Sequence, residues 1–396
     1  MDVVTTEERP PPGHDADAST TTRPHTRSTR LRRLGAAVRY ALPALVAYTA
    51  VRATGVLVVY LWARSAGENP KSVLSQFDGV YYLSIARVGY DGYAQVQSDM
   101  AFFPLYPGLV AAADVVSPFG LRATALLVGC AASLAAAWGM FAIGDRLHGR
   151  AVGVLLAVLW GVLPHAVVQS MTYTEGLFTA LAAWTLYALL RERWLTAGVL
   201  CLLAGLARPT ASALIPVVVL AALVAIVRRR DGWRPWVAGA LAPLGWLGYL
   251  AWVGRQTGRV DGWFHIQEAG WGSSFDFGVF LVQRGREVLA AASGLQLYVV
   301  TGVCLVAIML FVLSVLDRQP WQLLLYSGLM LVTTLGAAGY YHSKARFLIP
   351  AFTLLLPVAV ALARAGRARA TTVVVTLAIF SAYYGGYLMM VWGRSP

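Results

Sequence analysis

Long apolar runs recur in this sequence from about residue 40 onward, and they constrain the fold more than any other feature. Each run holds roughly 17 to 23 residues, enough for a helix to cross a hydrocarbon core about 30 Å thick. About eleven runs of this length can be counted. We therefore predict an all-α, polytopic membrane protein with about eleven transmembrane helices.

The composition agrees with this prediction and narrows the possible functions. The chain has 396 residues, of which 58% are hydrophobic and only 13% are charged, whereas soluble domains are about one quarter charged. Because the spans consume more than half of the chain, no room remains for a separate soluble enzyme, nucleotide-binding or DNA-binding domain. Any chemistry must involve the membrane helices and the loops between them.

The organisation along the chain follows from these runs. Residues 1–38 have almost no large apolar side chain, so we expect a disordered, basic cytoplasmic tail. Residues 39–396 form the integral membrane domain. The first span is expected at 40–62, a first outer loop at 63–120 and a second large outer loop at 255–294. The other spans are predicted at 121–143, 151–170, 175–191, 195–207, 211–227, 235–254, 295–316, 321–339, 347–363 and 371–391.

Some apolar stretches are too short to cross by themselves. Leu105–Val116, within the segment 104–117 of the first outer loop, is flanked by prolines, and we predict a juxtamembrane helix there. The predicted spans 195–207 and 211–227 are also short and meet at Arg208-Pro209. Such an arrangement is typical of broken helices that line a cavity rather than face lipid.

The basic residues predict the orientation. A net charge of +13 would suggest nucleic acid in a soluble protein, but here the arginines gather at span ends, so no nucleic-acid partner is expected. The positive-inside rule then puts the N-terminus in the cytoplasm of a multi-pass cell-membrane protein. Every candidate site residue falls on the outer face. The arginines assigned to the cytoplasmic face are Arg146, Arg150, Arg191, Arg193, Arg228, Arg229, Arg230, Arg234, Arg318, Arg364, Arg367 and Arg369.

Several catalytic motifs are absent from the sequence. It has no phosphate-binding Gly-rich loop ending in Lys-Ser/Thr, no His-Glu-x-x-His and no Gly-x-Ser-x-Gly. ATP hydrolysis, zinc proteolysis and serine hydrolysis are therefore disfavoured. There is also no Asp-x-Asp pair in an outer loop, and the three cysteines are scattered, so neither a metal nor another cofactor is expected.

The most informative stretch lies in the first outer loop. It reads Phe77-Asp78-Gly79-Val80-Tyr81-Tyr82-Leu83-Ser84-Ile85-Ala86-Arg87-Val88-Gly89-Tyr90 and is followed by Phe102-Phe103-Pro104-Leu105-Tyr106-Pro107. It resembles the PIG-V-type mannosyltransferases, which add the second mannose in GPI-anchor assembly, and their bacterial relatives in the GT-C superfamily. Further matching segments are Tyr173–Phe178, Gly205–Thr210 and His342–Phe347 with Pro350. One departure is Phe77, where the family usually has Trp.

This resemblance implies a function. It implies a GT-C-like fold with juxtamembrane helices in the first outer loop, and an acidic residue of that loop, Asp78, as the general base for an acceptor hydroxyl. The donor is expected to be polyprenyl-phosphate-mannose, which is a substrate rather than a cofactor. The acceptor, on the outer side of the membrane, is a glycolipid, a glycan or a protein. The remaining candidate substrate-binding residues are Tyr82, Asp99, Glu175, Arg208, His342, Lys344 and Arg346.

Each candidate also has a structural interpretation. Asp78 fits a helix N-cap, and Glu175 in the first turn of a span complements the helix dipole. Lys344 and Arg346 at an outer helix end can snorkel to lipid phosphate, or grip the phosphate of the donor together with Arg208 and His342. The other candidates also have a structural alternative. Tyr82 fits an interfacial aromatic belt, and His342 fits a core histidine whose hydrogen bonds are satisfied. Asp99 fits either a solvated surface residue or a substitute base.

We therefore expect a glycosyltransferase that moves mannose from polyprenyl-phosphate-mannose to an acceptor hydroxyl with inversion. The main alternative is a transporter or flippase of a lipid-linked sugar, which would bind the phosphate without breaking a bond; no internal repeat supports it. A structural membrane subunit and a pentosyltransferase are further alternatives. Arg52, a charged residue inside the first span, is an additional candidate for a functional role.

Overall fold

The computed structural model describes residues 1–3, 25–90 and 97–396, without the side chains of 25–34. The chain divides into two compact units, Met1–Tyr40 and Ala41–Pro396. The first unit contains the beginning of helix α1 (His25–Ser65). All regular elements in the described ranges are helical, and the extended backbone there forms only an isolated β-bridge between Phe275 and Ala337.

The start of α1 corrects the predicted tail. We expected disorder up to about residue 38, but the helix already begins at His25. Once an apolar helix is nucleated, each added residue gains a backbone hydrogen bond at little cost, and arginine and leucine have good helix propensity. The predicted tail otherwise falls on 4–24, outside the described residues.

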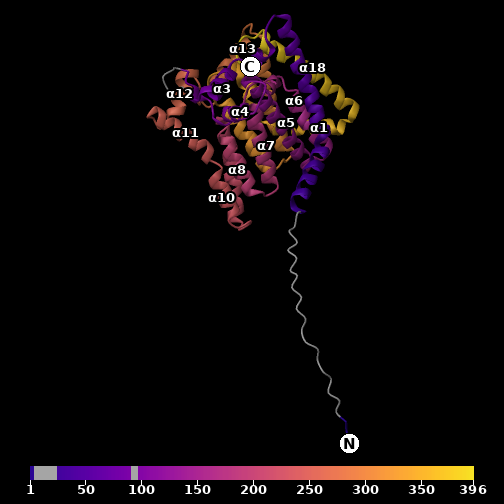
Figure 1. Cartoon of the computed structure of the whole chain (residues 1–396). Helices are drawn as coiled ribbons and strands as arrows, with labels where there is room; N and C mark the ends of the chain where they lie inside the picture. The colour runs from indigo at the N-terminus through magenta and orange to yellow at the C-terminus, as the bar shows by residue number, and fades with distance from the viewer. Residues whose placement is uncertain (4–24, 91–96) are drawn as a thin grey trace. The chain divides into compact units, whose positions relative to one another are not determined.

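The second unit contains the rest of α1 and all later elements (Figure 1). They are α2 (Pro70–Val73), α3 (Asp78–Val88), η1 (Asp99–Ala101), α4 (Leu105–Asp114), α5 (Leu121–His148), α6 (Arg150–Gly161), η2 (Ala166–Ser170), α7 (Glu175–Leu190), α8 (Trp194–Gly205), η3 (Pro209–Ala213), α9 (Ile215–Val227), α10 (Arg234–Leu241), α11 (Leu244–Thr257), α12 (Gly262–Trp271), α13 (Val279–Ala290), α14 (Leu295–Leu316), α15 (Trp321–Leu335), η4 (Tyr341–Ser343), α16 (Lys344–Phe347), η5 (Phe352–Leu355), α17 (Leu356–Ala365) and α18 (Arg367–Met390).

The described part of the chain has six helical stretches that are long and apolar enough to cross a membrane, or seven if one bent pair counts as a single span. This confirms the prediction of an all-helical, multi-pass membrane protein in its coarser form. The six are Gly35–Ser65, Leu121–His148, Pro209–Val227, Arg234–Thr257, Leu295–Leu316 and Arg367–Met390. The bent pair is Tyr341–Phe347 with Phe352–Ala365, at an angle of 73°.

Four shorter apolar helices, α6, α7, α8 and α15, occupy the other predicted positions. The predicted span 151–170 is not one helix, because α6 stops at Gly161 and η2 follows. Likewise 235–254 divides into α10 and α11, and 347–363 begins in the bent pair. A proline lies at or near each interruption, and proline removes a backbone donor and clashes with the preceding turn. The predicted short helix of the first outer loop is present as α4.

Helix α5 packs against both α6 and α7 (Figure 1), and small residues make this possible. A Cβ built on Gly153 of α6 would lie 2.6 Å from the carbonyl oxygen of Phe141 on α5. A Cβ on Gly176 of α7 would lie 2.3 Å from the Ser133 hydroxyl. Two helix backbones can approach this closely only where one residue has no side chain. Glycine at such contacts is common between membrane helices.

The interrupted helices keep their backbone groups paired inside the protein. Arg52 of α1 donates to the carbonyl oxygen of Gly161 at 3.3 Å and to the Ser170 hydroxyl at 3.1 and 3.3 Å. At the bend after α16, Trp160 donates to the carbonyl of Ile349 and Tyr326 to that of Pro350, each at 3.0 Å. Irregular backbone is tolerated at membrane depth when other parts of the protein satisfy its hydrogen-bonding groups, as these side chains do. Arg52 thus binds neutral groups at a chain break.

The α5–α6 contact yields a first prediction. Gly153→Ala should lower the free energy of unfolding by about 1–3 kcal/mol, because the new methyl group meets backbone that cannot move aside. Thermal unfolding of the detergent-purified protein measures this. Gly248→Ala in α11 is the matched control, since a Cβ there meets no atom within 4 Å; equal midpoints for the two variants would contradict the packing described.

Candidate functional site

A cavity of about 150 Å³ lies where three chain breaks meet α3. Arg208 comes from the α8–η3 break and Arg346 from α16, and Glu175 lies beside them at the start of α7. This cavity is called the chamber below. Its walls are formed by Asp78, Tyr82, Ala101, Phe102, Phe103, Ala207, Arg208, Pro209, Gln267, Trp271, Ser273, Ala337, Ala338, Gly339, Tyr340, Lys344, Arg346, Phe347 and Ser395.

Asp78 is the first residue of α3, not its N-cap. The N-cap is Phe77, which has φ 56° and makes no capping hydrogen bond through its side chain. A bulky residue rarely adopts this region of backbone conformation. The N-cap interpretation of Asp78 is therefore wrong, because the carboxylate points to an arginine instead of back to its own helix: Asp78 Oδ2 accepts from Arg346 Nη1 at 2.8 Å.

Gly79 explains how Asp78 reaches this position. A Cβ on Gly79 would lie 2.2 Å from Oγ1 of Thr172, a residue that is completely buried. The start of α3 therefore lies directly on the segment that leads into Glu175. Only glycine permits this approach, which brings two carboxylates from distant parts of the sequence, Asp78 and Glu175, close to Arg346.

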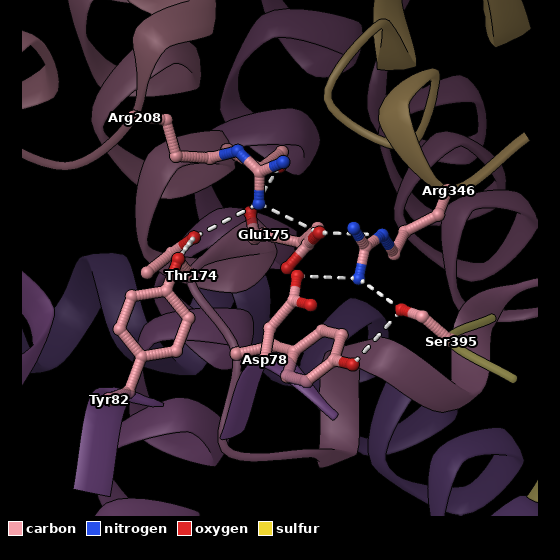
Figure 2. A network of polar contacts seen from close by, with 9 residues as sticks. Asp78, Tyr82, Thr174, Glu175, Arg208, Arg346 and Ser395 are labelled. Carbon is pink, nitrogen blue, oxygen red and sulfur yellow. Dashed lines mark hydrogen bonds and ion pairs between the residues drawn. The ribbon is translucent and has the colours of Figure 1, made fainter. Parts of the chain in front are cut away.

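Glu175 is the buried centre of the charge network shown in Figure 2. Its side chain is 1% exposed, and its Oε1 lies 2.7 Å from Arg208 Nη1 and 3.6 Å from Arg346 Nε. The first contact is a close ion pair, and the second is too long for a hydrogen bond. Glu175 also begins α7, as predicted, where its charge complements the helix dipole.

Arg346 is fixed from several directions. Its Nη1 donates to Asp78 Oδ2 and, at 2.9 Å, to the Ser395 hydroxyl. The guanidinium carbon lies 5.2 Å from the ring centre of Tyr173 and 4.9 Å from that of Phe347. These aromatic faces favour a nearby cation. Arg346 therefore has a defined orientation toward Asp78.

Tyr82 and Thr174 continue the network on the other side (Figure 2). Arg208 Nη1 donates to Thr174 Oγ1 at 2.9 Å, and the Tyr82 and Thr174 hydroxyls share a hydrogen bond of 3.2 Å. Burial raises the pKa of Tyr82 above its ordinary value, so the phenol keeps its proton at neutral pH. Tyr82 is thus a buried residue of the chamber wall rather than a member of an exposed aromatic belt.

Lys344 is also buried and lines the chamber. Its Nζ donates to the carbonyl oxygens of Thr334 at 2.9 Å and Ala337 at 2.5 Å. These carbonyls lie at the end of α15, where a cation complements the helix dipole. An ammonium group has three protons, so one remains available beyond these two bonds. The alternative of snorkelling to lipid phosphate does not describe this side chain, because it is only 1% exposed at the protein surface.

Two predicted site residues lie elsewhere. Asp99 is buried in η1 and is not among the described residues that form the chamber wall. The ring centre of His342 lies 5.5 Å from that of Tyr340 and 6.1 Å from that of Trp392, and His342 too is outside the wall. The backbone carbonyl of His342 accepts a hydrogen bond from the buried Gln296.

The sequence did not single out several wall and network residues. Gln267 and Trp271 come from α12 in the second large outer loop, where we had assigned no individual residue. Ser395 follows the last helix and belongs to no motif. Thr174 directly precedes Glu175 in a segment that carried the family resemblance. This position was the one indication in the sequence that Thr174 lies near the site.

The chamber wall carries the cations Arg208, Lys344 and Arg346 and the carboxylate Asp78. Glu175 is not part of the wall but contacts Arg208, and together these five groups have an excess of one positive charge. Among the described residues, no group of three or more His, Cys, Asp or Glu side chains is placed to hold a metal ion. An anionic ligand therefore fits the chamber better than a cationic one. Comparison with protein-family models and with curated proteins gave no match to this chain.

The contact at Gly79 yields a second prediction. Gly79→Ala should lower the free energy of unfolding by about 1–3 kcal/mol, because the new Cβ collides with Thr172 Oγ1. Thr172→Ala removes that oxygen, so the double variant Gly79→Ala/Thr172→Ala should recover much of the loss. Chemical or thermal unfolding measures both. Gly108→Ala in α4, where a Cβ meets open space, should be neutral or slightly stabilising, and a Gly79→Ala protein as stable as this control would refute the close approach.

Proposed function

We propose that the protein is a membrane glycosyltransferase that moves mannose from polyprenyl-phosphate-mannose to an acceptor hydroxyl, with inversion at the anomeric carbon. The observation that carries the proposal is the shared chamber: a carboxylate with 27% of its side chain exposed, Asp78, lies beside three buried cations. The choice of mannose rests on the sequence resemblance alone.

Asp78 has the geometry of a general base. Its Oδ2 is bound to Arg346, and no hydrogen bond to Oδ1 is present within the described ranges. Oδ1 can therefore accept the proton of an acceptor hydroxyl while Arg346 holds the other oxygen in place. A base must come within about 2.6–3.2 Å of the proton-bearing oxygen, and a small chamber restricts that oxygen to few positions.

The charge of the chamber suits the proposed donor. A sugar linked to a lipid through one phosphate is a phosphodiester with a single negative charge, which matches the single excess positive charge. When the sugar leaves, the lipid phosphate gains a second negative charge. Arg346 and Arg208 can bind phosphate oxygens through paired N–H groups, and Lys344 has a proton left over. Cations placed where charge develops stabilise the transition state, so no general acid is required.

The walls suit a single sugar ring. Phe102, Trp271 and Tyr340 provide aromatic surface, and Gln267 provides an amide. A cavity of this size is compatible with a small ligand group such as one sugar ring.

The finer points of the proposal follow from the sequence. The four short helices and the bent pair complete eleven crossings when they are counted with the six long stretches. The positive-inside rule puts the chamber on the outer face of the cell membrane and the N-terminus in the cytoplasm. This is the arrangement that the resemblance to the GT-C superfamily implies.

The proposal makes a third prediction. Asp78→Asn keeps the size of the side chain but removes its basicity, so transfer of labelled mannose from polyprenyl-phosphate-mannose should fall by about 10²–10⁴-fold. The assay follows the label in membranes that carry the wild type or the variant. Asp114→Asn, on the same loop but outside the chamber, is the matched control and should transfer normally.

Transfer by Asp78→Asn at the wild-type rate would remove Asp78 from the mechanism. If the wild type transfers no label to any extracted lipid or glycan, the proposed reaction is wrong, and a transporter or flippase of a lipid-linked sugar becomes the better explanation.

A further inference from the structure

The segment after α18 turns back into the chamber. Helix α18 ends at Met390, and a few residues later the Ser395 side chain forms part of the chamber wall. Gly393 has φ 70°, a backbone conformation that residues with a side chain rarely adopt. Arg394 is exposed, whereas Pro396 is buried. The direction of the segment is therefore inward.

Two hydrogen-bonding groups of the candidate site hold Ser395 (Figure 2). Its Oγ accepts from Arg346 Nη1 at 2.9 Å, and it lies 3.4 Å from the Tyr173 hydroxyl. The two protons of Arg346 Nη1 are thus divided between Asp78 Oδ2 and Ser395 Oγ. Since a hydrogen bond is directional, this pair of acceptors fixes the rotation of the guanidinium plane.

A second contact anchors the segment. The ring of Trp392 lies 6.1 Å from that of His342, which belongs to the same stretch of chain as Arg346. Trp392 and Ser395, which lie on either side of Gly393, therefore both contact this stretch. The segment Trp392–Ser395, called the strap below, closes one wall of the chamber.

We propose that Ser395 is a positioning residue that holds Arg346 against Asp78, and that the strap is an integral wall of the substrate chamber. The role of Ser395 in the reaction rests on the proposed function, whereas the position of the strap is independent of it. Without the Ser395 hydroxyl, one proton of Nη1 loses its acceptor, and Arg346 can turn away from Asp78. The carboxylate then loses its fixed orientation toward the acceptor hydroxyl.

The first test is enzymatic. Ser395→Ala should lower kcat/KM for mannosyl transfer about tenfold, the usual effect of losing a hydrogen bond to a charged group. Ser395→Thr keeps a hydroxyl and should stay within about threefold of the wild type on the same energy scale. Arg369→Ala, at an exposed position of α18 outside the strap and the chamber, is the control and should be unaffected. A wild-type rate for Ser395→Ala, or a Ser395→Thr variant as slow as Ser395→Ala, overturns the positioning role.

The second test does not depend on the reaction. In full-length protein carrying Cys130→Ala, the two remaining cysteines, Cys201 and Cys304, are buried. A hydrophilic thiol reagent should then label Ser395→Cys several-fold more slowly than Arg394→Cys. Adding Gly393→Ala, which strains the backbone at this position, should raise the labelling of Ser395→Cys toward that of Arg394→Cys.

The two tests separate the possible failures. If the wild type transfers no mannose but the labelling result is obtained, the proposed function fails and the strap remains as a wall of a chamber with another ligand. Equal labelling of Ser395→Cys and Arg394→Cys overturns the strap, whatever the enzymatic result.

Discussion

The buried carboxylate of Glu175 is the interaction on which the candidate site depends. An isolated ion in a protein interior costs several kcal/mol, and only partners of opposite charge with good geometry offset this cost. Arg208 at 2.7 Å and Arg346 at 3.6 Å are the cations beside Glu175, which they contact by ion pairing and without hydrogen-bond geometry, and they come from two different breaks in the helical bundle. Both arginines also line the chamber. Asp78 and Ser395 then complete the coordination of Arg346.

The helix breaks are therefore the means by which polar groups reach this depth. A continuous transmembrane helix uses its own carbonyls and amides, so it offers a ligand only side chains. Where the helices stop, the exposed backbone needs other partners, and Arg52, Trp160 and Tyr326 supply them. Lys344 does the same for the end of α15 while it lines the chamber. Lys344 thus both supports the fold and forms part of the candidate site.

Much of this arrangement could be predicted from the sequence. Apolar runs predicted the positions of the helices, and Arg208-Pro209 predicted a broken helix lining a cavity, which the structure contains. Prolines inside 151–170, 235–254 and 347–363 indicate where these helices are interrupted. Hydropathy alone does not show the interruptions, because the sequence stays apolar across them. The extension of α1 to His25 was missed because low hydrophobicity was taken as disorder, although arginine-rich segments continue helices well.

The pairing within the site could not be predicted in the same way. Asp78 and Arg346 are far apart in the sequence, and their contact depends on how α3 packs on the Thr172–Glu175 segment. Ser395 lies in a short segment without a pattern, so its position is known only from the contacts in the structure. His342 belongs to the same motif as Lys344 and Arg346, yet its ring faces Tyr340 and Trp392, because consecutive residues of a helical turn point in different directions.

A double-mutant cycle between Glu175 and Arg208 tests the central claim most directly. The free energy of unfolding would be measured for the wild type, Glu175→Gln, Arg208→Gln and the double variant. Breaking a buried ion pair from one side costs about 3–5 kcal/mol, so each single variant should be strongly destabilised and the double variant should lose much less than the sum. Strictly additive losses would show that Glu175 and Arg208 do not stabilise each other, and the described origin of the site would be wrong.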